Sequence, residues 1–528
     1  MIIDSRIASE TGEYDILIVG AGPAGIAMAN ELDGTGLRVA LLESGGEEFD
    51  GDTQELYDGD VTGLEEEFDL TASRLRFLGG TSNHWGGRCV PLDPIDFARA
   101  PFSGLTGWPI SREELLRYYP RANTYCGVGE FEYEPDAATG MTAEDFLMPA
   151  DSSVEAAIVR QSSVNFGETY RDALRASDNV HLWLWANLTG LGFSSDGTVE
   201  GVQIQTLDGQ VLEFRAPNVV LACGAIENAR ILMLANRANA TTYGDAGGLL
   251  GAGYMDHPAG GAAFLHPTQT LVHNPHWDKD LASTDGVPLW LLWRLRDEVL
   301  DREGLANGQF YLLPFRESTH AERDREAKRG MVALRQIAKW AVGHGKYDFS
   351  LSDSYCEFIL NTDAMAATTI TGGWGEAPVQ KVLLKYEAEQ QPTRDNRVTL
   401  GERPDRFGQA LPVLHWAPGE FDRDSLLRTT TLIGAACGRA DIGRVELEPN
   451  FEKPYFGTTT SWHQIGTTRM SEAASDGVTD PDGRVHGTTN LYMAGGSVMP
   501  TSGRANPTLT IVALTLRLTD HLKAKMET

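Results

Sequence analysis

The sequence predicts a mixed α/β (α+β) fold, in which a nucleotide-binding unit on a parallel sheet is interrupted by an inserted domain on an antiparallel sheet. Three observations predict this fold. An apolar strand with a glycine-rich turn lies near the N-terminus, at residues 14–44. Segments of related character follow at 78–88, 219–235 and 462–522. Between them, aromatic-rich runs with a strand-like pattern alternate with polar loops, as expected of a second domain inserted into the first.

The N-terminal segment passes from a strand into a helix at a glycine-rich motif. In Asp15–Val19, the four residues after Asp15 are continuously apolar, and Gly20–Gly25 follows as G-x-G-x-x-G. Gly20 permits a tight turn, and Gly22 lets the backbone approach a pyrophosphate that faces the helix N-terminus. Gly25 lets helix and strand pack closely. These properties predict a dinucleotide site in a Rossmann-like unit.

An acidic residue completes this unit. The helix over Ile26–Leu32 leads to a second strand, Arg38–Leu42, which ends at Glu43. A carboxylate about 20 residues after the glycines can bind ribose hydroxyls. It also disfavours the 2′-phosphate of NADP. By itself, the motif is compatible with both FAD and NAD.

The scattered segments predict a discontinuous nucleotide-binding domain, comprising residues 1–97, 179–260 and 456–528. The substrate-binding domain is then expected at 98–178 and 261–455. Its expected elements are a helix capped by Ser111 that runs through Tyr118, strands at 287–293, 309–315 and 381–386, and a helix with one basic face at 320–341.

Composition excludes several classes of function. The net charge of −30 over 528 residues disfavours nucleic acid and anionic membrane surfaces as partners. No run approaches the roughly 18 apolar residues of a membrane-spanning helix. The N-terminal residues carry no export signal pattern, so a cytoplasmic protein is expected. The five cysteines form no C-x-x-C motif, so neither a disulfide framework nor a metal site is expected.

Motifs in the middle and at the C-terminal end carry a family resemblance. They are Leu78–Trp85, Val219–Asn228, Trp462–Met470, Asn490–Ser497 and Pro500–Thr510. In this order they resemble the glucose–methanol–choline (GMC) oxidoreductases, and within that family the branch of pyranose oxidases and related sugar dehydrogenases. The resemblance implies a GMC-type FAD-binding domain and FAD as the cofactor. A nicotinamide dehydrogenase would explain Gly20 to Glu43 but not the C-terminal motifs.

The resemblance implies that His463 is the catalytic histidine and Asn506 its partner. The chemistry of the two side chains agrees with these roles. A neutral imidazole can accept the proton of an alcohol near neutral pH. The asparagine amide does not titrate in this range, but it can hydrogen-bond the substrate oxygen as negative charge develops.

The other motif residues are expected to bind FAD. The loop at 78–85 contributes Gly80, Thr81, Asn83, His84 and Trp85, and Leu188 follows a strand at 181–185 and is expected at the adenine. The middle strand contributes Ala222 and Gly224, and the C-terminal stretch contributes Gly495, Gly496, Pro507 and Thr508. Pro507 suits a first helical turn, where its missing N–H costs nothing.

Two positions leave alternatives open. Pyranose oxidases join the histidine before tryptophan in this loop covalently to the flavin, and other relatives hold FAD without that bond. His84-Trp85 is compatible with both arrangements. The chain has Gly86 where pyranose oxidases carry a threonine near the flavin, which leaves oxygen in question as the electron acceptor. His257, in Met255–Pro258, is interpreted as part of a structural turn.

The predicted function is FAD-dependent oxidation of a secondary hydroxyl of a sugar, glycoside or polyol to a ketone. The partners expected are a small-molecule substrate and an acceptor of unknown type, which can be oxygen, a quinone or a protein. An oligomer is compatible with the sequence. The alternative is a flavoprotein subunit of a larger dehydrogenase that passes electrons to a cytochrome or another partner, with the basic face at 320–341 as the candidate docking surface.

Overall fold

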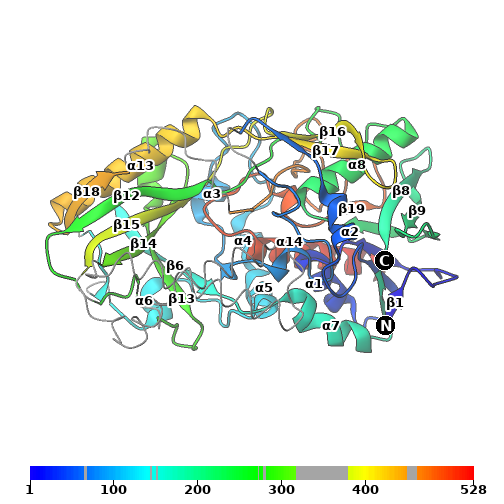
Figure 1. The fold of residues 1–528 in the computed structure, drawn as a ribbon, viewed down its shortest axis with the longest axis horizontal. Coiled ribbons are helices and arrows are strands. Elements are labelled where there is room, and N and C mark those ends of the chain that lie inside the picture. Colours follow the sequence, from blue (N-terminus) through cyan, green and yellow to red (C-terminus); the bar gives the residue numbers. More distant parts are fainter. Residues whose placement is uncertain are drawn as a thin grey trace, which may run out of the picture.

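The computed structural model describes residues 1–64, 68–142, 145–149, 153–271, 273–277, 281–316, 379–448 and 461–527. The molecule is elongated, with a parallel sheet toward one end and a large antiparallel sheet toward the other (Figure 1). Both chain termini lie at the parallel-sheet end. The helix predicted at 320–341, Cys356 and the acidic run 65–67 lie outside the described residues.

The first sheet has six parallel strands in the order β1-β7-β3-β2-β11-β19. The strands are β1 (Ile2–Asp4), β2 (Ile16–Val19), β3 (Val39–Leu42), β7 (Val180–Leu184), β11 (Asn218–Leu221) and β19 (Leu491–Met493). Every residue of β2, β3, β11 and β19 is buried. Such continuous burial is typical of parallel strands covered on both faces. The sheet unites segments that are hundreds of residues apart, as the scattered motifs predicted.

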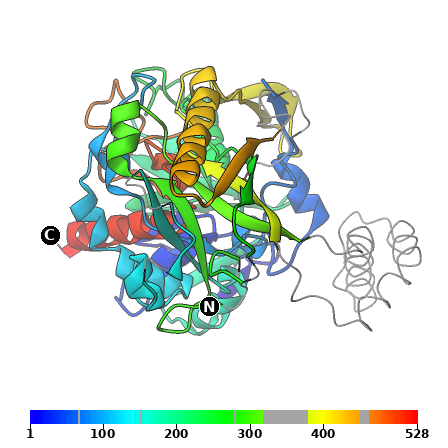
Figure 2. The same ribbon diagram turned by 90° about the vertical axis from the view of Figure 1, so that its left-hand side faces the viewer.

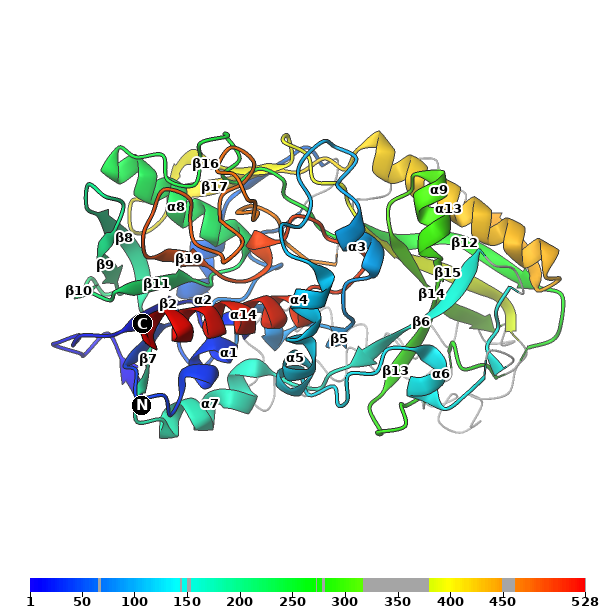
Figure 3. The same cartoon turned by 180° about the vertical axis from the view of Figure 1, so that it is seen from behind.

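Helices cover the two faces of this sheet. Helices α1 (Pro23–Leu32) and α14 (Thr508–Glu527) pack against each other on one face, and α8 (Ala225–Asn239) lies on the other (Figure 3). Helix α7 (Phe166–Ala176) contacts α1. The N-termini of α1 and α8 directly follow the turns after β2 and β11, so both point to the carboxyl edge of the sheet, where ligands bind in open α/β sheets.

The second sheet has seven antiparallel strands in the order β18-β12-β15-β14-β13-β6-β5. They are β5 (Arg88–Cys89), β6 (Val154–Gln161), β12 (Ala259–Pro267), β13 (Leu289–Leu295), β14 (Gly308–Arg316), β15 (Val379–Ala388) and β18 (Gly443–Leu447). Helix α13 (Glu420–Arg439) packs on β12 and β18 (Figures 1 and 2). This confirms the antiparallel sheet and three strands predicted for it.

Two small sheets complete the fold. One joins β8 (Asn187–Phe193), β9 (Val199–Gln205) and β10 (Val211–Phe214), and the other joins β4 (Asp60–Thr62), β16 (Arg397–Pro404) and β17 (Ala410–His415). The short helices are α2 (Gly51–Gln54), η1 (Glu55–Tyr57), η2 (Gly80–Asn83), α3 (Pro94–Ala98), α4 (Arg112–Leu116), α5 (Tyr119–Cys126), α6 (Pro135–Thr139), α9 (Asp297–Glu303) and η4 (Gly496–Val498).

The helix predicted from Ser111 through Tyr118 is shorter than expected. Ser111 caps it, since its hydroxyl accepts the backbone N–H of Glu114 at 3.1 Å. The helix ends at Leu116, and a second helix begins at Tyr119. Pro120 explains the break, because it has no N–H to donate to the carbonyl of Leu116.

The domain boundaries at residues 97, 178, 260 and 455 stay a prediction. The strand pair β16–β17, from the expected substrate-binding part, contacts α8 of the parallel-sheet unit. Among the described residues, no helix has the length and apolar character needed to cross a membrane. Within the described ranges, none of the four cysteines forms a disulfide.

Candidate active site

A cavity of about 490 Å³ runs from the carboxyl edge of the parallel sheet to the antiparallel sheet. Ligand cavities in proteins commonly measure about 300–1,000 Å³. Sixteen of the eighteen predicted site residues line it: Gly20, Gly22, Glu43, Gly80, Thr81, His84, Trp85, Leu188, Ala222, Gly224, His463, Gly495, Gly496, Asn506, Pro507 and Thr508. The fold therefore brings together the four segments that the sequence motifs singled out.

The glycine-rich turn forms one end of the cavity. Gly20 has a φ of +102°, and a Cβ there would lie 2.6 Å from the carbonyl oxygen of Ala222. Gly22 is the N-cap of α1, and a Cβ built on it would meet no atom within 4 Å. Gly25 is outside the cavity, where a Cβ would lie 1.9 Å from the carbonyl oxygen of Gly20. Gly25 therefore serves the close helix–strand packing expected of the third glycine.

Glu43 lies at the end of β3 with its carboxylate buried. One oxygen accepts the backbone N–H of Ala21 at 2.9 Å, and the other accepts that of Gly45 at 3.0 Å. These bonds connect the glycine-rich turn to the loop after β3. The carboxylate also faces the cavity, so it combines a structural contact with a position suited to a ribose.

The loop at 78–85 is held by its own side chains. Asn83 does not line the cavity; its amide donates to the carbonyl oxygens of Leu78 and Gly80 at 3.0 and 2.8 Å. Trp85 donates its indole N–H to the carbonyl oxygen of Val164 at 2.8 Å. A sequence motif does not distinguish a residue that holds its own loop from a residue that faces a ligand. The hydrogen bonds of Asn83 are those of a residue that holds its loop.

His84 faces the cavity beside Trp462, with the ring centroids 5.3 Å apart and the planes inclined by 31°. Its Nε2 atom is buried and has no hydrogen-bond partner. Burial lowers the pKa of the imidazole, so the neutral form is favoured. Trp462 has a φ of +56°, an unusual backbone conformation for a large side chain, and such conformations concentrate at functional sites.

His463 and Asn506 meet on the wall of the same cavity. The Nε2 atom of His463 lies 3.5 Å from the amide nitrogen of Asn506, whose Oδ1 is buried without a partner. Burial lowers the pKa of His463 well below its usual value, and the nearby His257 and Arg88 lower it further. The imidazole is therefore neutral at neutral pH, as a proton acceptor must be. Asn506 precedes Pro507, whose carbonyl accepts from Ile511 at the start of α14.

His257 contacts His463 directly, which the interpretation of Met255–Pro258 as a structural turn did not anticipate. The two Nδ1 atoms are 2.9 Å apart, and the rings meet edge to face with planes inclined by 81°. His257 is 1% exposed, and its Nε2 lies 2.8 Å from the carbonyl oxygen of Gly503. The DHP sequence at 256–258 was the only signal for this residue, and it does not reveal the partner.

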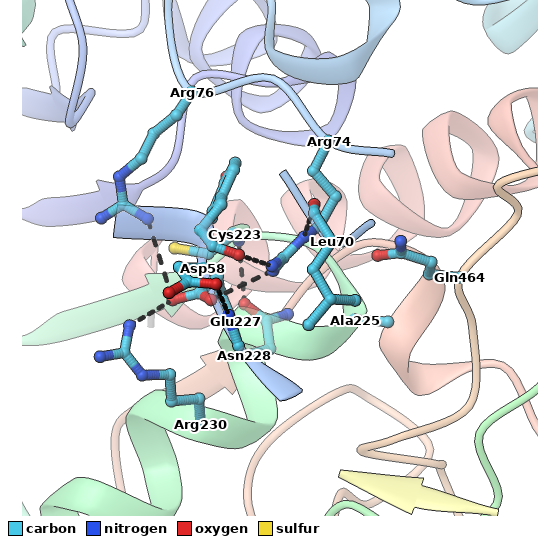
Figure 4. Close-up of polar contacts among 12 residues, drawn as sticks. Asp58, Leu70, Arg74, Arg76, Cys223, Ala225, Glu227, Asn228, Arg230 and Gln464 are labelled. Atoms are coloured by element: carbon cyan, nitrogen blue, oxygen red, sulfur yellow. Dashed lines mark hydrogen bonds and ion pairs between the residues drawn. The ribbon is translucent and has the colours of Figure 1, made fainter. Parts of the chain in front are cut away.

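An arginine cluster that the sequence motifs missed surrounds Glu227 (Figure 4). Arg74 and Arg230 each lie 3.1 Å from its carboxylate, and Arg76 lies 3.8 Å away. Arg230 also pairs with Asp405 at 2.6 Å. Burial raises the pKa of Glu227, but the three guanidinium groups together lower it below its usual value. All five residues line the cavity, and their formal charges sum to +1.

The antiparallel sheet supplies a charged wall. Arg88 of β5 pairs with Glu387 of β15 at 2.7 Å, and Lys385, two residues away on β15, also faces the cavity. Glu387 accepts further hydrogen bonds from Gln309 at 3.0 Å and Tyr311 at 3.1 Å. Strand alternation places Lys385 and Glu387 on one face. Sequence reasoning missed them because the partners are 299 positions apart.

Comparison with known proteins agrees with this architecture. Residues 392–515 match the family model described as GMC oxidoreductase. The chain is 23% identical to the 2-methyl-1,2-propanediol dehydrogenase of Mycolicibacterium austroafricanum, over 98% of this chain and 97% of that protein. It is also 23% identical to the fructose dehydrogenase large subunit of Gluconobacter japonicus, over 98% and 99% of the two chains.

Among solved structures, the fold is similar to that of a formate oxidase of Aspergillus oryzae RIB40. The TM-score is 0.57 at 17% identity, and the alignment covers 98% of this chain and 100% of that one. At this level of identity the likeness concerns the fold. It supports a Rossmann-like unit combined with an antiparallel sheet domain.

Proposed function

We propose that the chain is an FAD-binding member of the GMC oxidoreductase family and that it oxidises a secondary hydroxyl of a sugar, glycoside or polyol to a ketone. The observation that carries the proposal is the position of His463 Nε2 beside the Asn506 amide, on the same cavity as the dinucleotide-type glycine turn. A base and a hydrogen-bond donor near one point suit removal of a hydroxyl proton.

The cavity fits FAD in its space and in its polar groups. A Cβ at Gly22, Gly224 or Gly495 would meet no atom within 4 Å, so the backbone is open to a ligand at three points. Buried polar atoms without partners face the cavity from Arg76, His84 and Asn506. The helix N-termini and the net positive arginine cluster suit a pyrophosphate. Bound FAD supplies a two-electron acceptor for the hydride of the carbinol carbon.

His463 and Asn506 have separate roles in the proton transfer. His463, neutral at neutral pH, accepts the hydroxyl proton at Nε2. The amide of Asn506 donates to the same substrate oxygen as it gains negative charge. Because Asn506 does not titrate, His463 is the member of this pair that can accept the proton. His463 is partly buried, and this burial favours its neutral, proton-accepting form.

A polyhydroxylated substrate suits the charged wall. Arg88, Lys385 and Glu387 present donors and acceptors to the cavity that Trp462 also lines, and sugar hydroxyls can use both polar and aromatic groups. The names of the two relatives reported above, a diol dehydrogenase and a fructose dehydrogenase, support a hydroxyl-bearing carbon substrate.

We also propose that His84 is joined covalently to the flavin. The neutral imidazole and its unpartnered Nε2 on the cavity wall support this link. Acid precipitation of the purified protein tests it, since a yellow pellet indicates a covalent bond and a yellow supernatant indicates free FAD. In His84→Ala, the flavin is expected to move into the supernatant.

The function itself is tested by the visible spectrum under anaerobic conditions. The purified protein should show flavin absorbance, and one or more sugars or polyols in a panel should bleach it. A protein that stays colourless after reconstitution with FAD, or whose flavin no hydroxyl compound reduces, contradicts the proposal.

A second candidate is a flavoprotein subunit that passes electrons to a cytochrome or another protein. It is favoured by the full-length similarity to a large subunit of a dehydrogenase. Turnover with a soluble dye but not with oxygen would favour this candidate, and rapid reoxidation by oxygen would favour an oxidase.

A further inference from the structure

His257 lies between the backbone of the loop at Gly503 and the ring of His463. Its Nε2 is 2.8 Å from the carbonyl oxygen of Gly503, and its Nδ1 is 2.9 Å from Nδ1 of His463. A carbonyl oxygen can only accept a hydrogen bond, so Nε2 of His257 carries the proton. A neutral imidazole has one N–H, which leaves Nδ1 of His257 as an acceptor.

This arrangement determines the proton position on His463. Two facing imidazole nitrogens form a hydrogen bond only if one of them carries a proton. Because Nδ1 of His257 is the acceptor, Nδ1 of His463 must be the donor. The proton of neutral His463 is then on Nδ1, and its Nε2 is an acceptor. Burial lowers the pKa of both rings, which favours the neutral forms that this argument requires.

The contact of His463 with Asn506 independently supports the same tautomer. Its Nε2 lies 3.5 Å from the amide nitrogen of Asn506, and an amide nitrogen can only donate. One continuous chain of hydrogen bonds therefore runs from the Asn506 amide through His463 and His257 to the carbonyl of Gly503, and each group donates to the next. Reversing the tautomer of either histidine would place two donors or two acceptors face to face.

The backbone holds the two histidines in register. Oδ1 of Asp256 accepts the backbone N–H groups of His257 at 2.7 Å and of His463 at 2.8 Å. Met255 and Ile465 exchange both backbone hydrogen bonds, at 3.0 and 3.1 Å. The contact between the rings is therefore fixed at both main chains, and it does not depend on one side-chain rotamer.

We propose that His257 is a positioning residue, which keeps His463 in the tautomer with the proton on Nδ1 and so leaves Nε2 free to accept the substrate proton. The inference rests on the proposed role of His463 as the base. When Nε2 takes the hydroxyl proton, the bond from Nδ1–H to His257 becomes charge-assisted and stronger, which stabilises the imidazolium. His257 itself transfers no proton.

The closing experiment compares two substitutions of His257 in the FAD-loaded enzyme. His257→Phe keeps a ring but removes the acceptor, whereas the side-chain oxygen of His257→Asn can still accept from Nδ1 of His463. We expect His257→Phe to lower kcat about 10²-fold with KM nearly unchanged, because a misplaced base affects the chemical step. His257→Asn should restore most of that loss. His276→Phe, at another buried histidine outside the cavity, is the matched control and should leave kcat unchanged.

Two further measurements separate this inference from the proposed function. Ring ¹⁵N spectra of the wild type, assigned with His463→Gln, report the tautomer without turnover, and a proton on Nε2 of His463 would overturn the inference. In a His463→Ala background, His257→Phe should add no further loss of kcat. If no hydroxyl compound reduces the flavin, the proposed function fails, while the ¹⁵N spectra still decide the tautomer. A His257→Phe enzyme with bound FAD and wild-type kcat would also overturn the inference.

Discussion

The two ends of the cavity present different chemical groups to a ligand. At the parallel-sheet end, glycines and helix N-termini present backbone, as at Gly22 and Gly224, beside the arginine cluster around Glu227. At the antiparallel end, charged side chains present themselves from strands, as Arg88, Lys385 and Glu387 do. Backbone recognises what every phosphate-bearing cofactor shares, whereas side chains can change from one substrate to another. The comparison predicts that substitutions at the two ends should separate cofactor binding from substrate selection, while the proposed base, His463, lines the same cavity.

The largest effect is expected at His463. His463→Ala removes the base and should lower kcat about 10³-fold, within the range for loss of a general base. The flavin spectrum should be unchanged, because the glycine turn that holds the dinucleotide is intact. Anaerobic stopped-flow reduction of the flavin measures the effect. A variant that keeps more than a tenth of the wild-type rate would remove His463 from the mechanism.

The next effect probes the backbone end. In Gly25→Ala, the new Cβ would lie 1.9 Å from the carbonyl oxygen of Gly20, so the helix must move away from the strand. Such overpacking typically costs about 1–3 kcal/mol. We expect a lower Tm and a lower FAD content in the purified protein, with normal KM in the fraction that carries FAD. Gly438→Ala in α13, where a Cβ meets no atom within 4 Å, is the control and should not lower Tm. Equal behaviour of the two variants would argue against tight packing at Gly25.

A smaller effect is expected at the side-chain end. Lys385→Met removes a charge from the cavity wall but keeps the length of the side chain. We expect KM to rise about tenfold, equivalent to about 1.4 kcal/mol, with FAD content unchanged. Lys381→Met is the matched control, since Lys381 lies on the same strand over Phe264 and outside the cavity. If both substitutions change KM alike, the effect comes from the strand and not from contact with substrate.

The smallest change is expected in the pH profile. His463 is active as a base when neutral, and burial lowers its pKa well below the usual value. The neutral form therefore persists as the pH falls through about 6.5, the ordinary pKa of histidine. Activity should be lost only at lower pH, as His463 becomes protonated. The dependence of kcat/KM for anaerobic flavin reduction on pH measures this limb. A limb at or above about 6.5 would mean that His463 is more exposed to water than its burial indicates.

Much of the cavity could be anticipated from local patterns. The strand, turn and helix at Ile16–Leu32 were predicted because apolar strands and G-x-G-x-x-G turns depend on neighbours within about ten residues. Through family resemblance, the C-terminal motifs predicted His463 and Asn506 as the catalytic pair, and the fold places both on one cavity. Their roles stay predictions until the kinetics are measured.

The sequence by itself determined the class of fold, the dinucleotide-type turn and the resemblance to GMC oxidoreductases, because each of these depends on contiguous motifs. Only the tertiary structure decided which polar groups meet. His257 reaches His463 across 206 positions, and Arg88 reaches Glu387 across 299. Asn83, in the middle of a recognisable motif, turned out to hold its own loop. The physical reason is that hydrogen bonds and ion pairs act over about 3–4 Å, and that proximity between distant segments is set by how sheets and helices pack.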